Sequence, residues 1–129
     1  MQTYRKAPII FTPSAAGQVG RGFLLMSQWI RIAAVHDCPP GECRELVAGD
    51  RIVALYNVDG VFHAMDGVCP HQGGPLGKGQ LAGCIVTCPW HGWQFDVSTG
   101  QHLTNRAVRH FTFPVKVEGN AVFVEIEPS

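Results

Sequence analysis

The chain has 129 residues, of which 46% are hydrophobic and 16% charged, with 15 glycines and 9 prolines. This length suits one domain with a buried core and leaves no room for a large catalytic domain beside it. A turn-rich chain with few charged residues is typical of an all-β protein. The 10 basic and 10 acidic side chains balance, but the first 36 residues hold four basic and no acidic ones. The acidic remainder disfavours nucleic acid and suits a basic protein partner.

No stretch of the sequence approaches the roughly 18 apolar residues that a membrane helix needs. The longest apolar run near the start, residues 22–26, is also too short for the core of a signal peptide. We therefore expect a cytoplasmic protein that does not bind membranes. In that compartment 5 cysteines, an odd number, indicate reduced thiols or metal ligands rather than a disulfide framework.

Residues 1–25 are rich in glycine and proline and show no sustained apolar period of 2 or 3.6. We interpret them as an N-terminal extension that is disordered or absent from the natural protein, whose true start would be Met26. A targeting presequence is the alternative. The folded domain is then expected to cover residues 26–129.

Alternating or β-branched runs bounded by turn residues predict a series of strands. In chain order the predicted strands cover residues 29–35, 43–47, 51–58, 61–65, 81–86, 94–97, 101–103, 111–117 and 121–126. Asp59-Gly60 and Gly119-Asn120 are turns that join neighbouring strands into hairpins. Pro114 should place its strand at a sheet edge or at a bulge, because proline donates no backbone hydrogen bond. Without any helical period of useful length, the sequence predicts an antiparallel β scaffold.

Two short motifs stand out in this scaffold, Cys69-Pro70-His71 and Cys88-Pro89-Trp90-His91. Together they offer the two thiolates and two imidazoles that a mixed-ligand iron–sulfur centre uses. Zinc accepts the same ligands, so the spacing alone leaves a zinc site open. However, both motifs are predicted at hairpin tips and are followed by glycines, which let backbone amides approach bridging sulfides. This context favours a cluster over zinc.

The segments Cys-Pro-His-Gln-Gly-Gly-Pro-Leu, from residue 69, and Cys-Pro-Trp-His-Gly-Trp-Gln-Phe-Asp, from residue 88, resemble the two cluster loops of the Rieske family. The resemblance covers about residues 29–127. It implies an all-β, Rieske-type antiparallel β-sandwich with a small cluster-binding subdomain of two loops, at about residues 66–100. It also implies one [2Fe-2S] cluster as cofactor, with Cys69 and Cys88 on the buried iron and His71 and His91 on the outer iron near the surface.

Departures from the wider family point to one branch of it. Respiratory-chain Rieske proteins join their loops by a disulfide, at positions that are Gly74 and Trp90 here. They also place a serine and a tyrosine hydroxyl near the cluster sulfurs, where this chain has Trp93 and Phe95. Hydrogen bonds to sulfur stabilise the reduced state, so we expect a potential at the low end of the Rieske range, roughly −150 mV. The pattern is similar to that of the soluble Rieske ferredoxins that serve bacterial aromatic-ring dioxygenases.

The resemblance thus implies a low-potential one-electron carrier that is not itself an enzyme. It would accept electrons from a flavin-dependent ferredoxin reductase and pass them to a terminal ring-hydroxylating oxygenase through its His71 and His91 end, as a monomer. The sequence has neither a dinucleotide-binding fingerprint nor a phosphate loop, and no separate mononuclear iron motif. The alternative is the small Rieske subunit of an assimilatory nitrite reductase, with the large subunit as partner, although such subunits often have degraded motifs. A zinc-stabilised interaction module is a third hypothesis.

The remaining cysteines and aromatic residues have less specific interpretations. Cys84 is predicted to pack in the core, and Cys38 and Cys43 are expected to be reduced loop thiols. Trp90, Trp93 and Phe95 would shield the cluster, mark a docking surface or fill a small core. The other histidines have no spacing that suits a metal or a nucleophile, which leaves structural or solvent-facing roles for His36, His63, His102 and His110.

Overall fold

The computed structural model describes residues 27–127, so the predicted extension over residues 1–25 lies outside the described residues. Within the described range the chain is built almost entirely from antiparallel strands, which confirms the predicted all-β class. The strands are β1 (Gln28–Ala34), β2 (Cys43–Ala48), β3 (Arg51–Val58), β4 (Val61–Asp66), β5 (Gln80–Ala82), β6 (Ile85–Thr87), β7 (Gln94–Asp96), β8 (Thr112–Phe113), β9 (Val115–Glu118) and β10 (Ala121–Ile126). Two 3₁₀ turns, η3 (Val35–Asp37) and η4 (Leu76–Lys78), complete the regular structure of this part.

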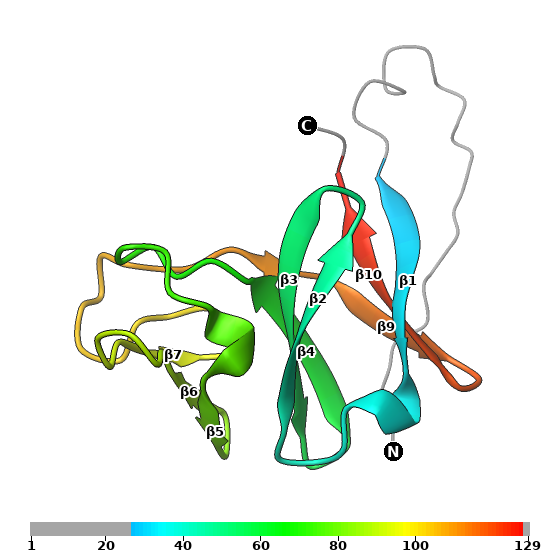
Figure 1. Cartoon of the computed structure of the whole chain (residues 1–129), viewed down its shortest axis with the longest axis horizontal. Helices are drawn as coiled ribbons and strands as arrows, with labels where there is room; N and C mark the ends of the chain where they lie inside the picture. Colours follow the sequence, from blue (N-terminus) through cyan, green and yellow to red (C-terminus); the bar gives the residue numbers. More distant parts are fainter. Residues whose placement is uncertain (1–26, 128–129) are drawn as a thin grey trace.

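The strands form three antiparallel sheets (Figure 1). One sheet has the order β1-β10-β9 and another the order β2-β3-β4-β8, and these two enclose a core between them. The third sheet, β5-β6-β7, belongs to a separate lobe beside β2, β3 and β4. The arrangement is a β-sandwich that carries a small subdomain.

Strand β3 is buried on both of its faces, because it lies between the two cores of the molecule. Val53 and Leu55 point into the sandwich core, whereas Ala54 and Tyr56 point into the core of the lobe. Alternate residues of a strand face opposite sides of a sheet, so a continuous buried run is what a central strand needs. The sheet that contains β3 therefore serves as the shared wall against which the lobe packs.

The predicted strand over residues 111–117 is wrong as a single element, because the chain changes sheets at Pro114. Strand β8, before Pro114, is the edge of the sheet that contains β3, and β9, after it, is the edge of the sheet that contains β1. Both pieces lie at sheet edges, as the missing N–H of proline requires. The hairpin of β9 and β10 has the predicted turn, with Ala121 paired to Glu118.

The lobe is formed by one continuous segment of the chain, residues 67–111, between β4 and β8. The single strand predicted over residues 81–86 is wrong: the chain reverses at Gly83, whose φ is +61°, so that Leu81 pairs with Val86 in a short hairpin. Residues 101–103 do not form the predicted strand either. They make isolated bridges instead, one of them between Phe95 and His102.

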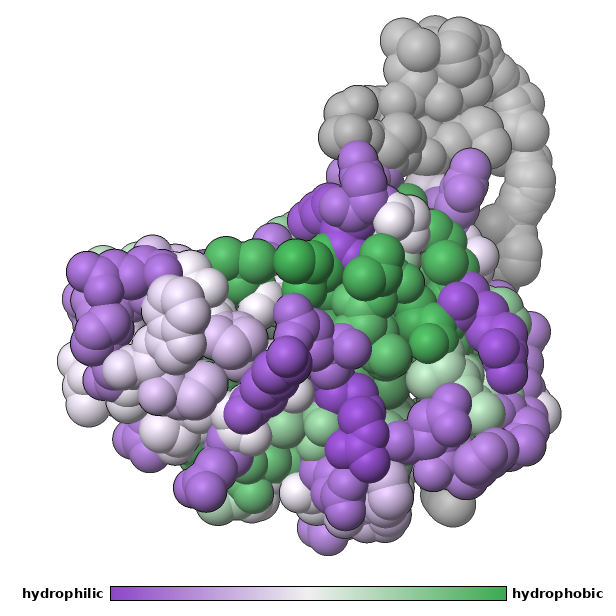
Figure 2. All heavy atoms as spheres, in the orientation of Figure 1, coloured by the Kyte–Doolittle hydropathy of each residue, from purple (hydrophilic) through white to green (hydrophobic). Residues whose placement is uncertain are grey.

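The contact between the lobe and the sandwich is close at η4. A Cβ on Gly77 would lie 2.7 Å from the Cα of Glu45 in β2, so only glycine lets these two backbones approach. Figure 2 shows apolar surface gathered over the middle of the molecule, whereas the lobe is mostly polar or intermediate on this face. Among residues 27–127, no helix has the length and apolar character to span a bilayer.

Candidate metal centre

The first candidate loop follows β4 and closes on itself through two backbone hydrogen bonds. The amide of Cys69 donates to the carbonyl of Gly74 (2.8 Å), and the amide of Gly73 donates back to the carbonyl of Cys69 (3.0 Å). Gln72 and Gly73 both have positive φ, 66° and 78°. A glycine is favoured at such a position, and the resulting tight turn holds His71 at the tip of the loop.

The second candidate loop joins β6 to β7 and repeats this hydrogen-bond pattern. The amide of Cys88 donates to the carbonyl of Trp93 (2.8 Å), and the amide of Gly92 donates to the carbonyl of Cys88 (3.1 Å). Gly92 has a φ of +77°, like the glycine at the same place in the first loop. The two loops therefore present one cysteine at the base and one histidine at the tip in the same way.

The two cysteines at the bases of the loops are buried and belong to the same core. Cys69 and Cys88 are each 2% exposed. Burial raises the pKa of the Cys69 thiol to about 11, a backbone hydrogen bond from His71 lowers it, and the Cys88 thiol beside it raises it further. Binding a metal would reverse this preference, because a coordinated thiol loses its proton.

The two loops touch directly at the bases. A Cβ on Gly74 would lie 2.6 Å from Sγ of Cys88 and 3.1 Å from Cβ of Trp90. Positions 74 and 90 are thus neighbours across the loops. The resemblance to the respiratory-chain Rieske proteins, which carry a disulfide at these two positions, implies the same. With glycine and tryptophan there, the contact is packing rather than a covalent bond.

The imidazoles of the two tips face one another at the surface. The ring centroids of His71 and His91 are 4.8 Å apart, with an angle of 75° between the planes. His71 is half-buried and His91 is exposed. The structure thus brings all four sequence-predicted residues together, with the thiols inside and the imidazoles outside.

This arrangement fits a two-iron cluster better than a single zinc ion. Among residues 27–127, no three Cys, His, Asp or Glu side chains are placed to hold one metal ion together. In a cluster each iron takes only two protein ligands, and the bridging sulfides supply the others. Two buried thiols and two outer imidazoles match that requirement, whereas a structural zinc site needs four converging ligands.

Three rings pack behind His71, and the sequence predicts two of them, Trp93 and Phe95, as residues that shield the cluster, but not His102. The indole of Trp93 stacks on the His71 ring, and His102 and Phe95 pack behind it. His102 is 9% exposed, and spacing could not place it in this group because it lies 31 positions from His71. The only sequence signal was the aromatic residue two positions after His91.

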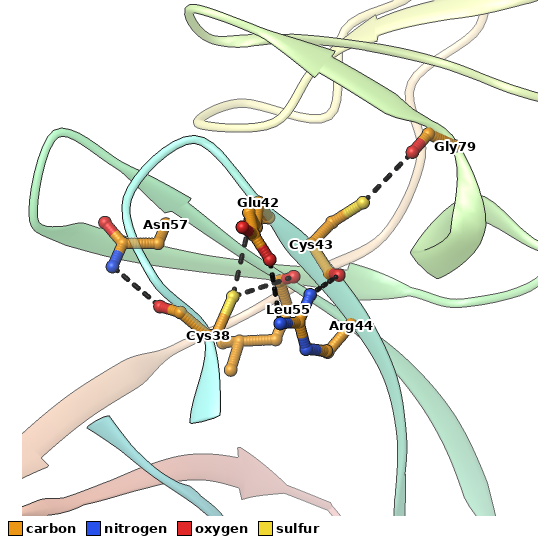
Figure 3. Close-up of polar contacts among 7 residues, drawn as sticks. All are labelled: Cys38, Glu42, Cys43, Arg44, Leu55, Asn57 and Gly79. Atoms are coloured by element: carbon orange, nitrogen blue, oxygen red, sulfur yellow. Dashed lines mark hydrogen bonds and ion pairs between the residues drawn. The ribbon is translucent and has the colours of Figure 1, made fainter. Parts of the chain in front are cut away.

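Two of the other cysteines, Cys38 and Cys43, make separate contacts near the start of β2 (Figure 3). The Sγ of Cys38 is 3.3 Å from the carbonyl oxygen of Glu42, whereas that of Cys43 is 3.2 Å from the carbonyl oxygen of Gly79. The two thiols belong to different cores and point apart, and both are free. The prediction of reduced loop thiols is confirmed for Cys38, which lies in the loop between η3 and β2 although its side chain is fully buried. Cys43 is also free, but it is the first residue of β2 rather than a loop residue.

The fold and this paired site define an iron–sulfur protein of the Rieske class, and comparisons with known proteins agree. The Rieske [2Fe-2S] domain matches residues 28–118. The ferredoxin component of an alkene monooxygenase system from Xanthobacter autotrophicus is 38% identical over 102 residues, which cover 78% of this chain and 84% of that protein. The ferredoxin component of a naphthalene 1,2-dioxygenase system from Pseudomonas aeruginosa is 32% identical over 103 residues, 79% of this chain and 99% of that protein.

A solved structure leads to the same family. The structure described as a complex of reduced oxygenase and oxidized ferredoxin in carbazole 1,9a-dioxygenase matches with a TM-score of 0.69 and 33% identity, over 74% of this chain and 91% of the matched chain. The chain belongs to the Rieske [2Fe-2S] domain family. It is an electron carrier, and its cofactor is a Rieske-type [2Fe-2S] cluster.

Proposed function

We propose that Cys69 and Cys88 hold the inner iron of the cluster and that His71 and His91 hold the outer iron. We also propose that the lobe, residues 67–111, is the cluster-binding subdomain, which extends beyond the expected range of about residues 66–100. The observation that carries this proposal is the pairing itself: two thiols 2% exposed at the bases of two matching loops, and two imidazole rings 4.8 Å apart at the tips. When bound, the cluster supplies reversible one-electron transfer. The loops hold its ligands, and the buried bases keep water from the thiolate side.

The exposed tip defines where electrons enter and leave. His91 is exposed and His71 is half-buried, so a partner that docks on the tips comes closest to the outer iron. At the other end, the thiolates are covered by the core that Tyr56, Leu76 and Phe95 share with them. The imidazoles are therefore the side through which a partner exchanges an electron.

The partners we propose are a flavin-dependent ferredoxin reductase as donor and a terminal oxygenase as acceptor. Support comes from the relatives, which are ferredoxin components of alkene monooxygenase and naphthalene dioxygenase systems, and from the complex between a ferredoxin and an oxygenase. The chain would catalyse no substrate chemistry of its own. The role of a nitrite reductase small subunit is less well supported, because these relatives are ferredoxins of oxygenase systems.

The ligand assignment is tested by two pairs of matched variants. Cys88→Ser and His91→Ala each remove one proposed ligand, whereas Cys84→Ser and His36→Ala change the same residue types outside the two loops. We expect the first pair to lose the visible absorption of the cluster and most of its iron, and the second pair to keep both. A Cys88→Ser or His91→Ala protein with a wild-type spectrum would refute the assignment of that residue.

The carrier role is tested by reconstitution. The purified protein, a flavin-dependent reductase with its reduced nicotinamide, and a ring-hydroxylating oxygenase are combined, and product formation is followed. We expect hydroxylation to require this chain and to stop with the His91→Ala variant. If no such pair of enzymes is coupled by the wild-type protein, the proposed partners are wrong, even where the cluster itself is present.

A further inference from the structure

The ring of His71 is held by a residue of the other loop. The indole of Trp93 lies parallel to the imidazole, with ring centroids 4.4 Å apart and an angle of 6° between the planes. Such a stack covers one face of the imidazole and opposes its rotation about the Cβ–Cγ bond. Trp93 follows His91 by two residues, so one loop supports the histidine of the other.

Trp93 is in turn held by His102. The two rings are perpendicular, at 90°, with centroids 4.7 Å apart. The same His102 ring also meets Phe95 at 83° and 5.2 Å, and Phe95 is fully buried. His102 therefore occupies the corner between Trp93 and the core of the lobe.

Two backbone amides orient the His102 ring. Its Nδ1 accepts hydrogen bonds from the amides of Thr104 (3.1 Å) and Asn105 (3.0 Å). A nitrogen that accepts two amide hydrogens carries none of its own, so the ring proton of neutral His102 is on Nε2. With 9% exposure and both amides bound, this ring has little freedom to turn.

We propose that His102 is a positioning residue for the metal centre. It acts through Trp93 to hold the imidazole of His71 in one orientation. The inference rests on the proposed assignment of His71 as a ligand of the outer iron. Residues behind a ligand commonly set its orientation and tune the metal. Here the support is ring packing: the backbone fixes His102, His102 fixes Trp93, and Trp93 fixes His71.

Loosening this support has two expected consequences. A His71 ring that samples several orientations gives a spread of iron environments and hence broader lines in the EPR spectrum of the reduced protein. It also lets water reach the outer iron, and water stabilises the more negative, reduced state, so the midpoint potential rises. Neither consequence is expected from a change that only weakens the fold.

Two substitutions at position 102 separate the ring contact from the backbone contact. His102→Asn keeps an acceptor for the amides of Thr104 and Asn105 but removes the ring behind Trp93. His102→Phe keeps a ring against Trp93 but removes the acceptor. The exposed His36 provides a control in His36→Asn, and Trp93→Leu removes the stack itself.

The holoproteins are compared by reduced-state EPR, by potentiometric titration, by the rate at which the cluster bleaches in air and by their melting temperature. We expect His102→Asn and Trp93→Leu to broaden the EPR lines, to raise the midpoint potential and to bleach roughly tenfold faster than wild type, the lower end of the usual loss on removing such support. His102→Phe should keep the wild-type lines and potential but melt at a lower temperature. His36→Asn should match the wild type in all four measurements.

Unchanged lines and potential in His102→Asn or in Trp93→Leu would overturn the inference, and so would equal changes in His102→Asn and His102→Phe. The ligand assignment has a separate readout. If His71→Ala keeps the wild-type EPR spectrum, that assignment fails first. If His71→Ala loses the spectrum while His102→Asn leaves it unchanged, only the positioning role fails.

Discussion

The hydroxyl of Tyr56 donates a hydrogen bond of 3.1 Å to the carbonyl of Leu76. Tyr56 belongs to β3 in the central sheet and Leu76 begins η4 in the lobe, so this bond ties the lobe to the sandwich. Both residues are fully buried in the core that also contains Cys69 and Cys88. Burial raises the pKa of Tyr56 far above its ordinary value, so the hydroxyl remains a donor above the pH at which an exposed tyrosine loses its proton.

Replacing Tyr56 by phenylalanine should lower stability modestly without loss of the cluster. The carbonyl of Leu76 also accepts a longer bond from the amide of Gly79 (3.3 Å), so it keeps one partner. We expect Tyr56→Phe to reduce the free energy of unfolding by about 1 kcal/mol in urea, the usual net value of one hydrogen bond. If the variant instead lost its cluster, Tyr56 would have a direct part in the centre that this geometry does not give it.

At Gly74 the two loops leave no room for a side chain. A Cβ there would lie 2.6 Å from Sγ of Cys88, so Gly74→Ala must push the loops apart or displace that sulfur. We expect its iron content after purification to fall by roughly tenfold, as when the support of a metal ligand is removed.

The matched control for this substitution is Gly119→Ala, in the β9–β10 turn. Gly119 has a φ of +58° but nothing within 4 Å of a built Cβ. Its replacement should cost about 1 kcal/mol of stability through backbone strain and leave the iron content unchanged. Equal iron contents in the two variants would show that the loops have more room than the structure indicates.

The reduction potential should respond to a hydroxyl at position 95. Phe95 is fully buried beside the loops and stands where respiratory Rieske proteins place a tyrosine. If Phe95→Tyr restores a hydrogen bond to sulfur, the reduced state gains about 1 kcal/mol. For one electron this corresponds to about 40 mV. We expect a midpoint near −150 mV in the wild type and a less negative value in the variant by potentiometric titration; a more negative value would contradict this account.

Cys38 makes the fold sensitive to alkaline pH. Burial, only partly opposed by the charge of Arg44, raises the pKa of this thiol from 9.0 to about 11. The folded state therefore holds the proton more tightly than the unfolded chain. The resulting stability is complete below about pH 9 and is lost as the pH rises through about 11.

Urea unfolding of the holoprotein between pH 8 and pH 12 checks this. The free energy of unfolding of the wild type should fall by about 2–3 kcal/mol more than that of Cys38→Ala over this range. At pH 8 the variant should be the less stable of the two, because it leaves a small cavity in the sandwich core. Parallel curves for the two proteins would show that Cys38 does not titrate as its burial indicates.

The sequence predicted the sandwich well where strands are long and bounded by clear turns. Strand β3 has the predicted bounds, because eight residues show a clear pattern and Asp59-Gly60 fixes its end. At Pro114 the sequence predicts only a sheet edge or a bulge, and it does not predict that the chain passes from one sheet to the other there. A strand that leaves one sheet and joins another keeps the same alternation on both sides of the break, so the pattern cannot show which sheet each half joins.

The lobe was less predictable, because its strands have only three residues and its order comes from contacts between loops. Three residues are too few to show a period, so the pattern predicts one strand where β5 and β6 form a hairpin. The paired motifs predicted a cysteine and a histidine for each loop, and the structure brings all four together. The contact of His102 with Trp93 depends on how the loop over residues 103–108 folds back, which no spacing in the sequence reveals.

The most direct test of the central claim, that two thiolates and two imidazoles of these loops hold one [2Fe-2S] cluster, is the EPR spectrum of the dithionite-reduced protein. Mixed ligation by cysteine and histidine gives a lower average g-value than ligation by four cysteines. We predict the lower average for the wild type. An average g-value typical of four thiolates, or a colourless protein with no reduced-state signal, would contradict the account.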